Sequence, residues 1–179
     1  MFDKFNRKGW VILNYFLDNP NKETHLRDIA KELKVSSSTA KIALDNLLKE
    51  NFIIENKVAN LRLFKCNLDN LVVRKLKTAK NLEWLNKTKI VEKVKKELNP
   101  ISIVLFGSFA KGDNGERSDI DILVISDNKN TFKENFLGRH ELQLIVMKPV
   151  EWHKKGKNED PFYLEVIING IPVYGRMPL

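Results

Sequence analysis

Apolar positions in the first third of the chain recur first at helical spacing and then at strand spacing. The pattern predicts a helix over 8–17 and, with Thr24 as its N-cap, a second helix over 24–33. After a short turn at 34–35, Ser36 is expected to cap a third helix. The inner stripe of that helix is formed by Ala40, Leu44, Leu47 and Leu48. Alternating stretches at 52–55 and 61–65 then predict a hairpin.

A long helical stretch follows over 71–98, where apolar residues recur without any glycine or proline. Two alternatives remain open, one long helix or two helices broken near Asn86. Its last part, 89–98, is expected to pack on a sheet, and Asn99-Pro100 ends it.

The remaining residues alternate between apolar runs and turns, which predicts a small sheet with helices. Strands are expected over 101–106, 119–126, 140–147 and 172–174, a short helix near Phe109 and a longer one over 159–169. The whole chain is therefore expected to be α+β.

The chemistry is concentrated between the first two of these strands. Asp119 and Asp121 are two residues apart in a strand, so both side chains point to the same face. Paired carboxylates suit hard divalent cations, which prefer oxygen ligands. Gly107-Ser108 forms a small-residue turn leading into a helix, where free backbone N–H groups favour phosphate. Metal and phosphate together indicate nucleotide chemistry.

These residues resemble the signature of the nucleotidyltransferase superfamily typified by DNA polymerase beta, and most closely that of the minimal nucleotidyltransferases. The matching positions are Gly107, Ser108, Ala110, Gly112, Ser118, Asp119, Ile120 and Asp121. The resemblance covers roughly 87–174. It implies that Asp119 and Asp121 hold Mg²⁺, that Gly107 and Ser108 hold the triphosphate of ATP, and that Ser118 orients Asp119.

The resemblance also implies a third carboxylate on a neighbouring strand, where this chain has Gln143. Glutamine cannot act as a general base and is a poorer magnesium ligand than a carboxylate. Glu141 lies two residues earlier on the same strand face and is the candidate catalytic substitute, given a shift of register. His140 is the alternative, because an unperturbed pKa of about 6.5 suits deprotonation of a hydroxyl; an ordinary surface histidine is the simpler interpretation.

The order of elements over 24–65 resembles a winged helix-turn-helix domain. In that family the third helix enters the major groove of duplex DNA, and hydroxyl and basic side chains make positioning contacts. The corresponding DNA-binding candidates are Ser37, Ser38 and Lys41 on the third helix, with Lys57, Asn60 and Arg62 on the wing. The alternative is a winged helix used only for dimerisation or protein contact.

Charge divides the chain into two unequal halves. Residues 1–99 carry 21 Lys/Arg and 12 Asp/Glu, a net charge of +9, whereas residues 100–179 carry 10 and 11, a net charge of −1. A basic half suits a polyanionic partner. The alternative is that surface lysines only solvate the helices.

Composition also bears on where in the cell the protein is expected to be. Hydrophobic residues make up 42% and charged residues 30% of the 179 positions, as in ordinary globular proteins. No apolar run approaches the roughly 20 residues that cross a bilayer, and the first residues lack the apolar core of a secretory signal. Cys66 is the single cysteine and is expected to be a packing residue. We therefore expect a cytoplasmic protein.

These observations predict a winged helix-turn-helix domain over 1–70, a helical linker over 71–86 and a mixed-sheet nucleotidyltransferase domain over 87–179. The expected activity is magnesium-dependent transfer of a nucleotidyl group, AMP by analogy, from a nucleoside triphosphate to an acceptor. Minimal relatives act as antitoxins on a partner toxin, so a toxin is one candidate acceptor, and a homodimer is one candidate assembly. The alternative is a DNA-binding regulator whose nucleotidyltransferase domain is inert or only senses nucleotide.

Overall fold

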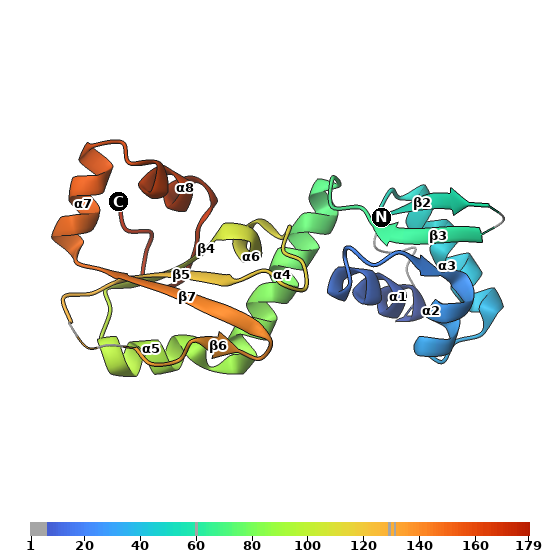
Figure 1. Cartoon of the computed structure of the whole chain (residues 1–179), viewed down its shortest axis with the longest axis horizontal. Helices are drawn as coiled ribbons and strands as arrows, with labels where there is room; N and C mark the ends of the chain where they lie inside the picture. The colour runs from blue at the N-terminus through green and yellow to red at the C-terminus, as the bar shows by residue number, and fades with distance from the viewer. Residues whose placement is uncertain (1–6, 60, 129, 131) are drawn as a thin grey trace. The chain divides into compact units, whose positions relative to one another are not determined.

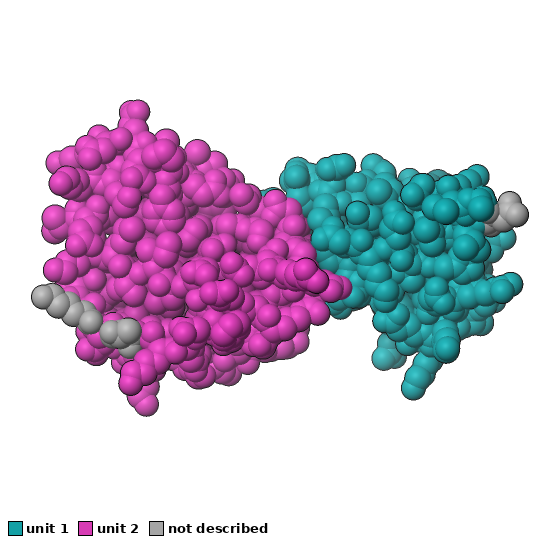
Figure 2. Space-filling view, in the orientation of Figure 1, with its two compact units in different colours: residues 1–76 teal, residues 77–179 magenta. Residues whose placement is uncertain are grey.

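The chain divides into two compact units, residues 1–76 and 77–179 (Figures 1 and 2). The computed structural model describes residues 7–59, 61–128, 130 and 132–179. Its helices and sheets confirm the predicted α+β class. Among the helices of these described ranges, none is both long and apolar enough to span a membrane.

In its described residues, unit 1 combines helices with a small antiparallel sheet. The sheet has the strand order β1-β3-β2, and the predicted hairpin is confirmed as β2 and β3. In chain order the elements are α1 (Arg7–Asp18), β1 (Thr24–His25), α2 (Leu26–Glu32), α3 (Ser37–Lys49), β2 (Ile53–Val58) and β3 (Leu61–Cys66). Asn60, one of the predicted wing residues, lies outside the described residues.

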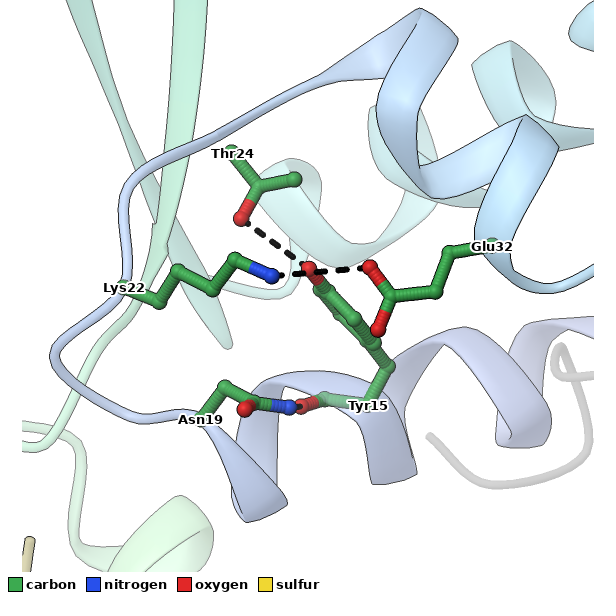
Figure 3. A network of polar contacts seen from close by, with 5 residues as sticks. All are labelled: Tyr15, Asn19, Lys22, Thr24 and Glu32. Carbon is green, nitrogen blue, oxygen red and sulfur yellow. Dashed lines mark hydrogen bonds and ion pairs between the residues drawn. The ribbon is translucent and has the colours of Figure 1, made fainter. Parts of the chain in front are cut away.

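The predicted helix cap at Thr24 is wrong, because Thr24 belongs to strand β1 and pairs with Phe64 of β3. Its hydroxyl is buried and hydrogen-bonds the Tyr15 hydroxyl at 3.2 Å (Figure 3). His25 caps α2 instead, and its Nδ1 accepts the N–H of Arg27. In the same network Lys22 pairs with Glu32, and Asn19 donates to the Tyr15 carbonyl. These contacts join α1, α2 and the connection between them.

The core of unit 1 forms where the apolar stripes of its helices meet β2 and β3. Ser36 caps α3 as predicted, since its Oγ accepts the N–H of Thr39 at 3.1 Å. The stripe of α3 is buried at Ala40, Leu44 and Leu47. Cys66 is buried in the same core, consistent with a packing role.

The helical stretch is broken into α4 (Leu71–Thr88) and α5 (Ile90–Leu98). The two-helix alternative is confirmed, and the break falls at Lys89, three residues beyond Asn86, where the backbone is left-handed. The first turns of α4 pack into the core of unit 1 through Val73, while Leu85 near its end lies in a core of unit 2. One helix therefore contributes to both units.

Unit 2 is a mixed five-stranded sheet with the strand order β6-β7-β5-β4-β8, in which β5 and β7 are parallel and the other pairs are antiparallel. Figure 1 shows α5 on one side of this sheet and α7 and α8 on the other, and each side has its own buried apolar cluster. The elements after α5 are β4 (Ser102–Phe106), α6 (Gly107–Lys111), β5 (Ile120–Ile125), β6 (Phe136–Leu137), β7 (His140–Met147), α7 (Pro149–Lys157), α8 (Pro161–Asn169) and β8 (Ile171–Tyr174).

Candidate active site

The turn between β4 and α6 is pressed against a carboxylate from the next strand. Phe106, the last residue of β4, pairs with Asp121 of β5. Gly107 follows with φ of +67°, and a Cβ at this position would lie 2.1 Å from Asp121 Oδ2. Only glycine satisfies both the backbone conformation and the lack of space. The fold thus brings the predicted phosphate turn and a predicted metal ligand together.

Asp119 and Asp121 lie close enough to influence each other's charge. Asp119 immediately precedes β5 and is exposed, whereas Asp121 is half-buried. Burial raises the pKa of the Asp121 carboxyl, the negative charge of Asp119 raises it further, and Lys111 opposes both effects. An Asp121 carboxylate held in this way is stabilised by any cation that binds beside it.

The neighbouring strand places Gln143 beside Asp121, because the parallel pairing of β5 and β7 sets these two residues in register. The register shift that would put Glu141 there is absent. Glu141 is exposed and accepts a hydrogen bond from Gln143 Nε2 at 3.1 Å. Across the described ranges, no group of three His, Cys, Asp or Glu side chains is arranged to hold a metal ion. The carboxylates available to a cation at this turn are therefore Asp119 and Asp121.

The two predicted serines have different environments. In the described part of the chain the Ser108 hydroxyl makes no hydrogen bond, which leaves it available to a ligand. The Ser118 hydroxyl accepts the N–H of Gly115 at 2.9 Å and so folds the loop that precedes β5. This bond to Gly115 differs from the expected one to Asp119.

Sequence reasoning missed the buried hydrogen bonds by which side chains of α4 hold α6. Thr78 Oγ1 donates to the Ala110 carbonyl, and Asn81 Nδ2 donates to the Phe109 carbonyl at 2.9 Å. Asn81 Nδ2 also donates to Asn114 Oδ1 in the loop before β5. No local pattern indicates these contacts, since they join residues about 30 positions apart. They fix the helix that begins at the phosphate turn.

Lys111 lies at the end of α6 and contacts α8. Its Nζ is 3.1 Å from Glu165 Oε1. Because Lys111 also lowers the pKa of Asp121, its charge acts on the carboxylate site from the side of α6. Its place near the turn leaves two interpretations of the sequence open, contact with the triphosphate or exposure to water, and the structure pairs it with Glu165.

The predicted DNA-binding residues all lie in unit 1. Those on α3 and at Lys57 are exposed, namely Ser37, Ser38, Lys41 and Lys57. Arg62 is already engaged: its guanidinium donates two hydrogen bonds to the Glu55 carboxylate, at 2.7 and 2.9 Å. It also lies 3.8 Å from Asp45 and over the Phe64 ring. Binding of Arg62 to a phosphate would have to compete with these contacts.

Comparison with known proteins agrees with this geometry. A family model described as "Polymerase beta, Nucleotidyltransferase" matches residues 88–178, which is half of the chain. The chain therefore belongs to the polymerase beta nucleotidyltransferase family, and the resemblance drawn from the signature is confirmed for this domain. The match contains the Gly107 turn and both aspartates.

Two curated proteins of Methanocaldococcus jannaschii are similar to the same part of the chain. One, named "Putative protein adenylyltransferase MJ0141", is 31% identical over 96 residues, covering 47% of this chain and 95% of the relative. The other, MJ1379, has the same kind of name and is 36% identical over 95 residues, covering 46% of this chain and 92% of the relative. Family membership and these names support transferase activity.

The raised pKa of Asp121 predicts a pH-dependent effect on stability. Its folded-state pKa exceeds the unfolded value, so the ionised carboxylate destabilises the fold at neutral pH. We expect Asp121→Asn to raise the melting temperature of the metal-free protein at pH 7. The difference should vanish once the pH falls below the ordinary carboxyl pKa of about 4, where the wild-type group is protonated. Calorimetric melting in EDTA across this range measures it, and a pH-independent difference would contradict the expectation.

Proposed function

We propose that the chain transfers AMP from ATP to a hydroxyl of a protein acceptor, at the site formed by Gly107, Ser108, Asp119 and Asp121. The observation that carries the proposal is the contact between Asp121 and the Gly107 turn. In this contact a carboxylate, a group suited to a cation, lies directly beside backbone that suits phosphate, which supports the proposal. Nucleotidyl transfer requires both functions at one point.

The donor set fits magnesium in a particular way. Mg²⁺ commonly binds through one or two protein carboxylates together with substrate phosphates, not through a complete protein cage. Asp119 and Asp121 supply two carboxylates. Because partial burial disfavours the charged form of Asp121, a cation bound beside it would stabilise that form. When bound, the metal would neutralise charge on the phosphates during in-line displacement.

The residues of the chain have separate tasks in this reaction. Gly107 and the Ser108 hydroxyl hold the triphosphate at the start of α6, which no side chain caps. Lys111, which pairs with Glu165 and acts electrostatically on Asp121, supplies positive charge near the phosphates. The acceptor hydroxyl attacks the α-phosphorus, the bond to the β-phosphate oxygen breaks and pyrophosphate leaves.

Without a register shift, Glu141 does not replace Gln143 beside Asp121. It directly precedes Leu142, the partner of Ile120, as Asp119 precedes Ile120, and from there it would take the hydroxyl proton.

A protein acceptor is favoured by two observations. The relatives from M. jannaschii are named as protein adenylyltransferases. In addition, Glu141 and Gln143 line an open pocket together with Phe132 and Phe136 from the segment before β7. A pocket with apolar and amide groups, beside the proposed base, suits a polypeptide side chain. A partner toxin is one such acceptor.

Binding of ATP tests the two aspartates directly. We expect the Asp119→Ala/Asp121→Ala protein to bind ATP in the presence of Mg²⁺ more than about tenfold more weakly than wild type, a loss above about 1.4 kcal/mol. Asp127→Ala is the matched control, since Asp127 is exposed beyond the opposite end of β5. Titration calorimetry with and without Mg²⁺ measures the affinities. Equal binding by all three proteins would refute the assigned metal site.

The proposed base is tested by moving its carboxylate. We expect Glu141→Gln to reduce transfer of labelled AMP by roughly 10²–10⁴-fold while ATP binding is retained. Adding Gln143→Glu should restore transfer in part, because position 143 is in register with Asp121. A fully active Glu141→Gln protein would remove Glu141 from the mechanism. If wild type binds ATP but transfers nothing to candidate acceptors, the nucleotide-sensing alternative gains support.

We further propose that unit 1 is a winged helix-turn-helix that binds duplex DNA. Its element order, its three-stranded antiparallel sheet and the exposed polar face of α3 support this assignment. The net charge of this unit supports DNA binding less strongly. Residues 1–70 carry 12 Lys/Arg and 9 Asp/Glu, so most of the +9 of the first half lies on α4 and α5.

DNA binding by the full chain should depend on salt. Each phosphate contact contributes about −0.9 to the slope of log affinity against log salt. We expect Lys57→Ala to flatten the slope by about one contact, and Arg62→Ala to flatten it less because Arg62 is paired with Glu55. Lys133→Ala in unit 2 is the charge-matched control. Mobility-shift titrations with random and promoter duplexes measure the binding. Absence of binding to either duplex at low salt would leave unit 1 as a protein-contact module.

A further inference from the structure

His140 lies at the start of β7 and reaches across to the residue that precedes Asp119. Its Nδ1 is 2.8 Å from the Ser118 carbonyl oxygen. A carbonyl oxygen only accepts hydrogen bonds, so Nδ1 carries the proton of this contact. In the neutral ring the lone pair is therefore on Nε2.

The imidazole ring is held in place by two aromatic neighbours. Phe109 of α6 meets it edge-to-face with ring centres 5.0 Å apart, and Trp84 of α4 does so at 5.7 Å. Phe109 is two residues beyond Gly107, so the ring contacts the helix of the phosphate turn on one side. On the other side, its hydrogen bond holds the backbone that leads into Asp119. His140 thus joins the two halves of the signature.

Asp119 depends on such support from its backbone. Within the described residues its carboxylate makes no hydrogen bond or ion pair with protein, and the side chain is exposed. The loop before it is held at one end by Asn81, through Asn114. At the other end Ser118 is held in two ways: its hydroxyl accepts the N–H of Gly115 within the loop, and its carbonyl accepts from His140, which lies outside the loop. The position of Asp119 therefore follows from where Ser118 is held.

We propose that His140 is a positioning residue that fixes Asp119 relative to the Gly107-Ser108 turn, and that it acts through the Nδ1 bond to Ser118 and not as a base on the acceptor. The proposal rests on the proposed function, because it gives Asp119 the role of a metal ligand. Loss of a group that orients a metal ligand commonly weakens metal affinity by 10–100-fold.

Two amide substitutions at His140 test the roles of the two ring nitrogens separately. The side-chain nitrogen of asparagine lies where Nδ1 lies, and that of glutamine lies near Nε2, so His140→Asn keeps the proposed donor and His140→Gln moves it away. The loss of the aromatic contacts with Trp84 and Phe109 is common to both variants. We expect similar falls in melting temperature for the two.

The readouts are amide hydrogen exchange of Ser118 and Asp119 in the metal-free protein, and Mg²⁺ titration at fixed ATP. We expect His140→Asn to keep wild-type protection and Mg²⁺ affinity. His140→Gln should exchange faster at both amides and bind Mg²⁺ about 10–100-fold more weakly. Equal behaviour of the two variants in exchange would overturn the positioning role. A different result separates this proposal from the proposed function. If the two variants differ in exchange as expected but wild type shows no Mg²⁺-dependent ATP binding, the proposed function is refuted. The hydrogen bond from His140 to Ser118 is then still supported as the contact that holds this backbone.

Discussion

The candidate site of unit 2 depends on the absence of a side chain at position 107. Asp121 Oδ2 occupies the space that a Cβ would need, and the positive φ of Gly107 turns the chain from β4 into α6 at that point. Burial of the Asp121 carboxyl raises its pKa, and the charge of Asp119 raises it further. The missing side chain at position 107 thus allows the turn and the place of Asp121 beside it.

The strands that carry this site are almost entirely buried. Every residue of β4 is buried, and in β5 all but Asp121 are buried. Clusters on both faces of the sheet hold the two strands, with α5 on one side and α7 and α8 on the other. The polar residues of the site are thus confined to the ends of the strands, where Asp119 and Asp121 can meet a charged ligand without disturbing the apolar core.

The sequence predicted most where burial and periodicity coincide. The strands near 101–106, 119–126 and 140–147 were readable because each is an uninterrupted or alternating apolar run. The two-residue strands β1 and β6 were not readable, because only pairing with a distant partner defines them. Thr24 shows the consequence, since a residue with the chemistry of a helix cap bonds to Tyr15 instead.

The site itself was predictable in part for the same reason. The spacing of Asp119 and Asp121 with the Gly107-Ser108 turn is local information, so their grouping followed from the sequence. Other features depend on how neighbouring strands align. They are the register that sets Gln143 beside Asp121, the contact from His140 to Ser118 and the pairing of Arg62 with Glu55. Sequence pattern names the residues of a strand and the face they share, but it does not specify which residue of the next strand lies opposite.

Helix α4 places part of the support for this site outside the residues that define the family. Thr78, Asn81 and Trp84 precede residue 88, where the family match begins, yet they contact α6, the loop before β5 and His140. In evolutionary terms, substitutions in this helix can alter the geometry of the site while the signature stays unchanged. Homologues with identical signatures can therefore diverge in activity through a segment that a comparison of signatures does not cover.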